Sequence, residues 1–130
     1  MILADTSVWV DHLRAGDKAL VALLDVGMVL AHPFVIGELA LGNLRQREIV
    51  LKALADLPRA SVATDAEVLH FIERHALSGR GIGYIDAHLL AAVTLTAGAE
   101  LWTKDKGLHG VAVQLGLAST LPKSRGSIGL

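Results

Sequence analysis

Four carboxylates stand apart from the rest of the 13 acidic residues of this 130-residue chain. Three of them, Asp5, Asp86 and Asp105, lie where a short apolar segment or a loop gives way to a predicted helix. The fourth, Glu38, lies inside the apolar segment PFVIGELAL at residues 33–41, with no basic residue three or four positions away. A carboxylate in such surroundings is costly unless a partner stabilises its charge. A cation held jointly with other carboxylates would do so, and a distant basic residue or exposure to water is the alternative.

Each aspartate also has an ordinary structural explanation. Asp5 and Asp105 can cap the helices that follow them, and Asp86 falls in the first turn of a helix, where the helix dipole favours an anion. Taken singly, these explanations are the better ones, because capping residues are common at helix starts. Glu38 lies too far inside its predicted helix to be a cap, so neither capping nor the helix dipole explains it.

The chemistry that four carboxylates can do together is the binding of a hard cation. Oxygen ligands without cysteine or histidine suit Mg²⁺ or Mn²⁺, and such a site can bind phosphate oxygens and activate a water molecule. The chain has no cysteine, which excludes disulfides, zinc–thiolate sites and thiol catalysis. Its six histidines include no HExxH motif, so a zinc site is not expected.

The elements that must position these acids alternate between short apolar strands and longer helices. The predicted strands are residues 2–4, 28–30, 61–63 and 100–103, with a late one near 118–121. The predicted helices are residues 6–14, 17–25, 33–42, 45–56, 64–77, 84–97 and 105–115, the fifth opened by a capping box of Thr64 and Glu67. The tail from Pro122 is predicted to be loose.

This alternation predicts an α/β fold in one domain spanning residues 1–130. We expect three layers, α/β/α, around a central parallel sheet of about four to five strands. Ligand sites in such folds lie beyond the carboxyl ends of the strands. That rule favours Asp5, after the first strand, and Asp105, after the strand that ends at Thr103.

Composition narrows the function classes. Hydrophobic residues make up 52% and charged residues 19%, which excludes disorder caused by a polar composition. The N-terminus has no signal-peptide pattern, and the longest uncharged runs, residues 26–37 and 87–99, are too short to span a bilayer. The net charge of −1 argues mildly against a strong electrostatic grip on nucleic acid. It does not exclude an enzyme that binds phosphate groups through metal ions.

Four motifs together resemble the PIN-domain family, and more narrowly the VapC-type toxins of bacterial toxin–antitoxin pairs. They are ILADTSVWVDHL at residues 2–13, PFVIGELALG at 33–42, GIGYIDAHLLAA at 81–92 and LWTKDKGL at 101–108. No single motif is specific, but the four occur in the family's order and cover nearly the whole chain.

The resemblance implies a cytoplasmic endoribonuclease that uses Mg²⁺ or Mn²⁺ to cleave structured RNA such as tRNA or rRNA. It also implies a homodimer and a VapB-type antitoxin that inserts a peptide into the active-site groove. Carried over by position, Asp5, Glu38, Asp86 and Asp105 match the family's catalytic and metal-binding acids. Thr6 and Thr103 match the hydroxyl positions beside the acids, where they would orient ligands or water.

Basic and aromatic residues supply further expectations. The candidate RNA contacts are Arg14, Arg45, Arg47, Arg80, Lys104 and Lys106, which flank the acidic motifs, and solubility is an equally good explanation for each. Trp9 and Trp102 are expected in the core rather than as stacking platforms. The helices between residues 33 and 56 are the candidate dimer interface.

Three other functions fit parts of the pattern. The chain could be a non-toxin PIN nuclease of RNA processing, or a protein whose complex represses transcription through a DNA-binding partner. It could also be a metal-binding regulatory module without turnover. A phosphatase of the haloacid dehalogenase type would need a second aspartate two residues after Asp5, and Ser7 occupies that position.

Overall fold

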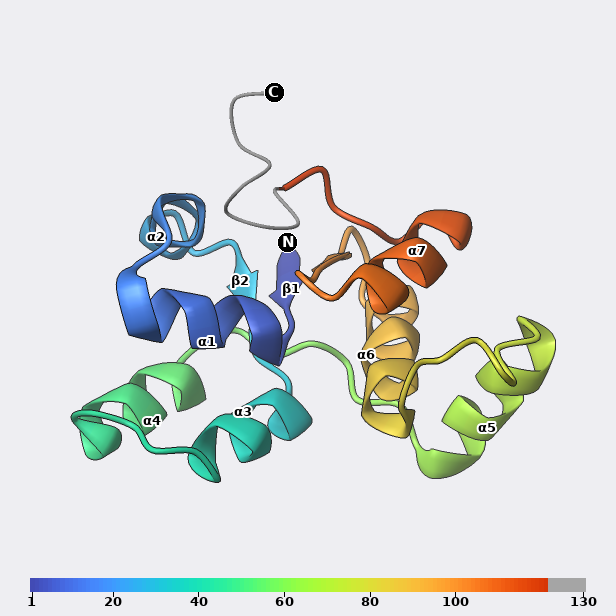
Figure 1. The fold of residues 1–130 in the computed structure, drawn as a ribbon, viewed down its shortest axis with the longest axis horizontal. Helices are drawn as coiled ribbons and strands as arrows, with labels where there is room; N and C mark the ends of the chain where they lie inside the picture. Colours follow the sequence, from blue (N-terminus) through green and yellow to red (C-terminus); the bar gives the residue numbers. More distant parts are fainter. Residues whose placement is uncertain (122–130) are drawn as a thin grey trace.

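The computed structural model describes residues 1–121, so the predicted loose tail from Pro122 lies outside the described residues. These residues form three strands and seven helices, of which Figure 1 labels β1, β2 and all the helices. The strands are β1 (Ile2–Ala4), β2 (Val29–Leu30) and β3 (Glu100–Trp102). The helices are α1 (Thr6–Ala15), α2 (Lys18–Asp25), α3 (Pro33–Ala40), α4 (Arg47–Ala55), α5 (Asp65–Arg74), α6 (Tyr84–Leu95) and α7 (Lys106–Gln114). Within residues 1–121, no helix has the length and apolarity needed to cross a membrane.

The sheet is parallel, with strand order β2-β1-β3, as the alternation of elements predicts. Ile2, Leu3 and Ala4 of the central strand are all buried. Because neighbouring side chains of a strand point to opposite faces, both faces of the sheet are covered, as expected for a parallel sheet. The expected α/β fold is confirmed, although the described sheet has fewer strands than expected.

Two predicted strands are reduced to single bridges at the sheet edges. The strand expected at 61–63 is wrong: the chain pairs earlier, where the N–H of Ala31 donates to Pro58 O at 2.7 Å and the N–H of Ala60 donates to Ala31 O at 2.9 Å. The N–H of Ser61 then donates to the Thr96 hydroxyl at 2.9 Å, which takes the next backbone donor away from the sheet. The late strand near residues 118–121 is only a bridge between Leu101 and Ala118.

The helix starts follow the side-chain caps that the sequence contains. Asp17 accepts a hydrogen bond from the N–H of Leu20, and Thr64 and Glu67 form the predicted capping box. At the start of α3 the cap is His32, whose Nδ1 accepts from the N–H of Phe34 at 3.1 Å. Burial, together with the nearby His88, lowers the pKa of His32 to about 4, so its ring is neutral at pH 7 and free to accept.

The topology directs four helix starts to one end of the sheet. α1, α3 and α7 each begin within a few residues of the carboxyl end of a strand. α6 precedes β3 in the chain, and Figure 1 shows its first turn at the end of the strands from which α1 and α3 also leave. In the same view α1 to α4 lie toward the β2 edge and α5 to α7 toward the β3 edge. The carboxyl end of the sheet therefore lies between two groups of helices.

Candidate active site

Asp5 is a buried carboxylate at the carboxyl end of the central strand, 6% exposed. Its backbone N–H continues the pairing of β1 with β3 by donating to Trp102 O at 2.9 Å. Its side chain accepts from the N–H of Ser7 at 2.6 Å and from the hydroxyl of Thr103. Burial raises the pKa of Asp5 and the charge of Asp86 raises it further, while hydrogen bonds from Thr103 and Ser7 act in the opposite direction.

Hydroxyl groups link Asp5 to the segment that carries Asp105. The Ser7 hydroxyl lies 3.3 Å from the Thr103 hydroxyl and accepts from the N–H of Lys104 at 3.0 Å. The Thr103 hydroxyl in turn accepts from the N–H of Asp105 at 3.0 Å. The resemblance implies a place for Thr103 beside the acids, whereas no role in the site was predicted for Ser7. A hydroxyl two residues after a strand-end acid is the signal that could have found it.

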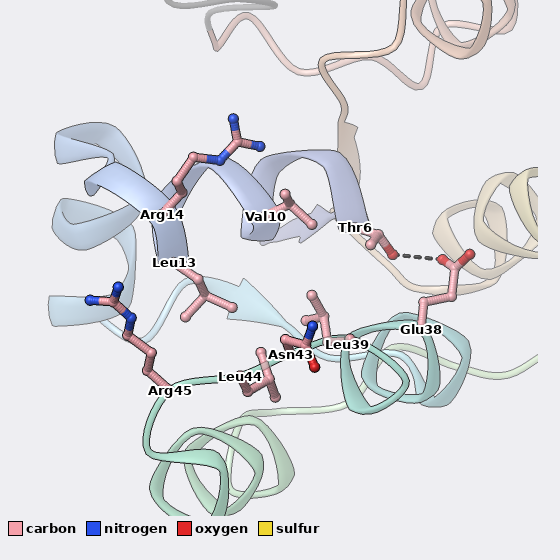
Figure 2. Close-up of a pocket in the computed structure, with 10 residues that line it drawn as sticks. Thr6, Val10, Leu13, Arg14, Glu38, Leu39, Asn43, Leu44 and Arg45 are labelled. Carbon is pink, nitrogen blue, oxygen red and sulfur yellow. Dashed lines mark hydrogen bonds between the residues drawn. The ribbon is translucent and has the colours of Figure 1, made fainter.

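Glu38 takes a hydroxyl partner rather than a basic one. The Thr6 hydroxyl donates to Glu38 Oε1 at 2.6 Å, and Figure 2 shows this bond bridging the first residue of α1 and the side of α3. Glu38 is exposed, so water stabilises its remaining oxygen. Thr6 is therefore adjacent to an acid, as the resemblance implies, and it positions Glu38 toward the start of α1.

Asp86 is the electrostatic centre of the group. Burial raises its pKa, and the charges of Asp105 and Glu38 raise it further. Asp86 also contributes to the raised pKa of Asp5. Asp86 therefore interacts electrostatically with each of the other three acids. Like charges interact this way only when they lie near one another. The fold thus brings Asp5, Glu38, Asp86 and Asp105 into one neighbourhood.

The ordinary explanations for three of these acids hold as well. Asp5 caps α1, Asp105 accepts from the N–H of Leu108 at 2.9 Å, and Asp86 accepts from the N–H of Gly83 at 3.0 Å. Asp105 is exposed and Asp86 is half-buried. Within residues 1–121, no three acidic or histidine side chains lie close enough together to hold one ion between them. The four acids therefore share a neighbourhood without forming a closed ligand cage.

Lys104 is not the free RNA contact that its position suggested. Its ammonium pairs with Asp17 at 3.0 Å and with Asp11 at 3.2 Å, and its side chain is only 8% exposed. It also lies 5.9 Å from the centre of the buried Trp102 ring. Arg47 is engaged too, since its guanidinium donates to the carbonyls of Ala40 and Gly42 at the end of α3. Trp9 and Trp102 lie in the core, as expected, at 6% and 1% exposed.

Comparison with known proteins defines the class to which this fold and acidic neighbourhood belong. Residues 2–114 match the PIN domain, so the chain belongs to the PIN-domain family. Among individual proteins it is 51% identical over 118 residues to Ribonuclease VapC32 of Mycobacterium tuberculosis, in strain CDC 1551 / Oshkosh and in strain ATCC 25618 / H37Rv. Each match covers 91% of this chain and 95% of the relative. No solved structure matches the chain significantly. The expected resemblance to VapC-type PIN toxins is confirmed.

We predict that replacing Lys104 with methionine destabilises the protein by about 3 kcal/mol, because it leaves the carboxylates of Asp11 and Asp17 without their common partner. The matched control is Lys52→Met, which removes the exposed Lys52–Asp56 pair and should cost under about 1 kcal/mol. Urea unfolding measures both. A loss for Lys104→Met no larger than for Lys52→Met would contradict the structural role of Lys104.

The Lys104 effect should also depend on pH. Burial alone would raise the pKa of Asp17, but the N–H of Leu20 and Lys104 lower it overall. A carboxylate with a lowered folded pKa contributes stability above its unfolded pKa of about 4, and this is lost as pH falls through the folded value. The difference in unfolding free energy between the native protein and Lys104→Met should therefore shrink at the acidic end of a pH series.

Asp5→Asn is expected to stabilise the protein at pH 7 in the absence of divalent cations. Because the folded pKa of Asp5 is raised above 3.8, ionising this carboxyl at higher pH costs native stability. Asparagine is nearly isosteric and avoids that cost, so the melting temperature should rise at pH 7. The gain should diminish as pH falls through the raised folded pKa and vanish below about 4. Asp25→Asn, an exposed control, should change little. A lower melting temperature for Asp5→Asn at pH 7 would count against the electrostatic account.

Proposed function

We propose that this protein is a metal-dependent endoribonuclease and the toxin of a type II toxin–antitoxin pair. One arrangement at the carboxyl end of the sheet carries the proposal. The Thr103 hydroxyl donates to Asp5, the Thr6 hydroxyl donates to Glu38, and Asp86 and Asp105 lie at the starts of α6 and α7. The similarity to Ribonuclease VapC32 supports the choice of RNA as substrate. On this proposal the four acids are both the metal ligands and the catalytic residues.

The donor set fits a hard divalent cation such as Mg²⁺ or Mn²⁺. It consists of carboxylates with hydroxyls behind them, and it offers no soft ligand. Glu38, Asp86 and Asp105 each have one carboxylate oxygen bonded within the protein, and their other oxygen has no hydrogen-bond partner within residues 1–121. These second oxygens, with Asp5, would hold the ion once their side chains rotate toward it.

When bound, the cation supplies positive charge that neutralises the acids and assists attack by water on a phosphodiester. The chain's own groups do the positioning. Ser7 and Thr103 fix Asp5, and the Thr6 hydroxyl orients Glu38 so that its second oxygen can accept a proton from the attacking water. Attack by water, rather than by the ribose 2′-hydroxyl, breaks the P–O3′ bond and leaves a 5′-phosphate and a 3′-hydroxyl.

The biological setting follows from the same proposal. The substrate would be a structured cytoplasmic RNA, tRNA or rRNA, whose cleavage is restrained by a VapB-type antitoxin. The protein would act as a homodimer through α3 and α4. Leu41, the residue directly after α3, and Ile49 of α4 are 91% and 65% exposed. Large apolar side chains this exposed mark interaction surfaces when they occur together.

The decisive assay incubates the purified protein, freed of any antitoxin, with total cellular RNA and Mn²⁺ and maps the new ends. We expect cleavage with 5′-phosphate ends, and a fall of at least about 100-fold in Asp5→Asn and in Glu38→Gln, because the acids supply ligands and a proton acceptor. EDTA should abolish cleavage by the native protein. Asp25→Asn controls for loss of an unrelated charge.

Two results would count against the mechanism. Cleavage that survives equally in EDTA and in Asp5→Asn would rule out the metal route. Ends carrying a 2′,3′-cyclic phosphate would show that the ribose hydroxyl attacks, and that water is not the nucleophile.

Self-association is tested by sedimentation of the native protein and of a Leu41→Lys, Ile49→Lys double variant. We expect a dimer for the native protein and a monomer for the double variant, because two charges replace apolar contact area. Leu69→Lys, on α5 and 57% exposed, is the matched control and should remain dimeric. A dimer that dissociates only in Leu69→Lys would move the interface to α5.

A further inference from the structure

A groove of about 480 Å³ opens beside the Thr6–Glu38 hydrogen bond, between α1, α3 and the turn after α3. This volume falls within the range of about 300–1,000 Å³ that holds small ligands. Figure 2 shows Glu38 and Thr6 at one end of the groove and Arg14 and Arg45 at the other. Arg14 and Arg45 therefore lie on the two sides of the groove at the end away from Glu38.

The two arginines are available to an anion. The side chain of Arg14 is 72% exposed, and its acidic neighbour Asp11, at 4.0 Å, is already paired more closely with Lys104 at 3.2 Å. Arg45 is exposed and has no ion pair within residues 1–121. Arg47, two residues further on, differs because helix carbonyls occupy its guanidinium.

Between the arginines and Glu38 the groove wall is apolar. Val10 and Leu13 of α1 line it and are 40% and 39% exposed. Leu39 and Leu44 line the facing side. The apolar wall lies between the arginines at one end of the groove and Glu38 at the other. Such a groove suits a ligand in which flat rings are joined by negatively charged groups.

We propose that this groove binds single-stranded RNA next to the cleaved bond, with phosphates on Arg14 and Arg45 and a base against Val10 and Leu13. The inference rests on the proposed function and deepens it by assigning the path of the substrate. A polyanion that reaches the acids must be held by cations outside them, and this groove is lined by two exposed ones, of which only Arg14 has an acidic neighbour within residues 1–121, at 4.0 Å. A duplex is too wide for a groove of this size, whereas an unpaired stretch can turn one base into it.

The test measures binding of a single-stranded RNA oligonucleotide of mixed sequence by fluorescence anisotropy across a salt series. Asp5→Asn is the common background, so that the RNA stays intact. Arg14→Gln and Arg45→Gln should each weaken binding by about threefold to tenfold. Each should also reduce the slope of log K against log salt by about 0.7, the value for one single-strand phosphate contact. Arg74→Gln, an exposed arginine on α5, is the matched control and should leave affinity and slope unchanged.

A kinetic readout separates this role from structural damage. With Asp5 restored, Arg14→Gln and Arg45→Gln should raise KM for cleavage and leave kcat near its native value, because the groove holds substrate away from the reacting atoms. A fall in kcat with unchanged KM would overturn the assignment. A tenfold excess of the same oligonucleotide annealed to its complement should compete poorly, and equal competition would overturn the single-strand claim.

The remaining outcomes distinguish this inference from the proposed function. If the native protein cleaves RNA but the arginine variants bind it as Asp5→Asn alone does, the groove assignment fails and the ribonuclease stands. If RNA binding is unchanged while binding of an acidic test peptide is lost, the groove is a peptide site. If the native protein neither cleaves RNA nor binds it in the Asp5→Asn background, both are overturned.

Discussion

The Thr103 hydroxyl donates to the carboxylate of Asp5 across 98 residues of sequence, and much of the site depends on that contact. It joins the segment after β3 to the carboxyl end of β1, where a buried carboxylate would otherwise lack a partner on one side. Burying such a group without hydrogen bonds would cost several kcal/mol. The bonds from Thr103 and Ser7 offset part of this cost, but the pKa of Asp5 remains raised. The fold therefore keeps an unfavourable charge at the centre of its sheet.

The arrangement of basic side chains explains how that charge is kept. Lys104 lies between Thr103 and Asp105 in sequence, yet its ammonium is turned away to Asp11 and Asp17. Had it paired with a site acid, it would have cancelled part of the negative charge of the group. Instead, hydroxyls of Thr6, Ser7 and Thr103 contact the acids or one another. Hydroxyls orient a carboxylate without cancelling its charge, so the negative potential is left for a cation.

Local sequence signals predicted much of the fold. Contacts between residues far apart in the sequence could not be predicted in this way. The caps at Asp17 and Thr64 act within four residues of themselves, so the starts of α2 and α5 could be read from the sequence. The edge strand expected at 61–63 failed because its register is set by Ala31, far back in the chain. The same limit applied to side chains. Nothing near Glu38 indicates Thr6 as its partner, and nothing near Lys104 indicates Asp17, 87 residues away.

The positions of the four acids could be predicted in part, because the local features that explain Asp5 and Asp105 as caps and Asp86 as a first-turn residue also orient them. A capping aspartate is oriented by a backbone N–H at a helix N-terminus, where the helix dipole offsets part of its charge. The starts of α1, α6 and α7 lie toward one end of the sheet, so capping alone orients Asp5, Asp86 and Asp105 within one neighbourhood. Glu38 has no cap to hold it and needs the Thr6 hydroxyl at the start of α1 instead. Capping therefore does not compete with the proposed metal site, since the hydrogen bonds at the helix starts supply the orientation on which a shared cation would depend.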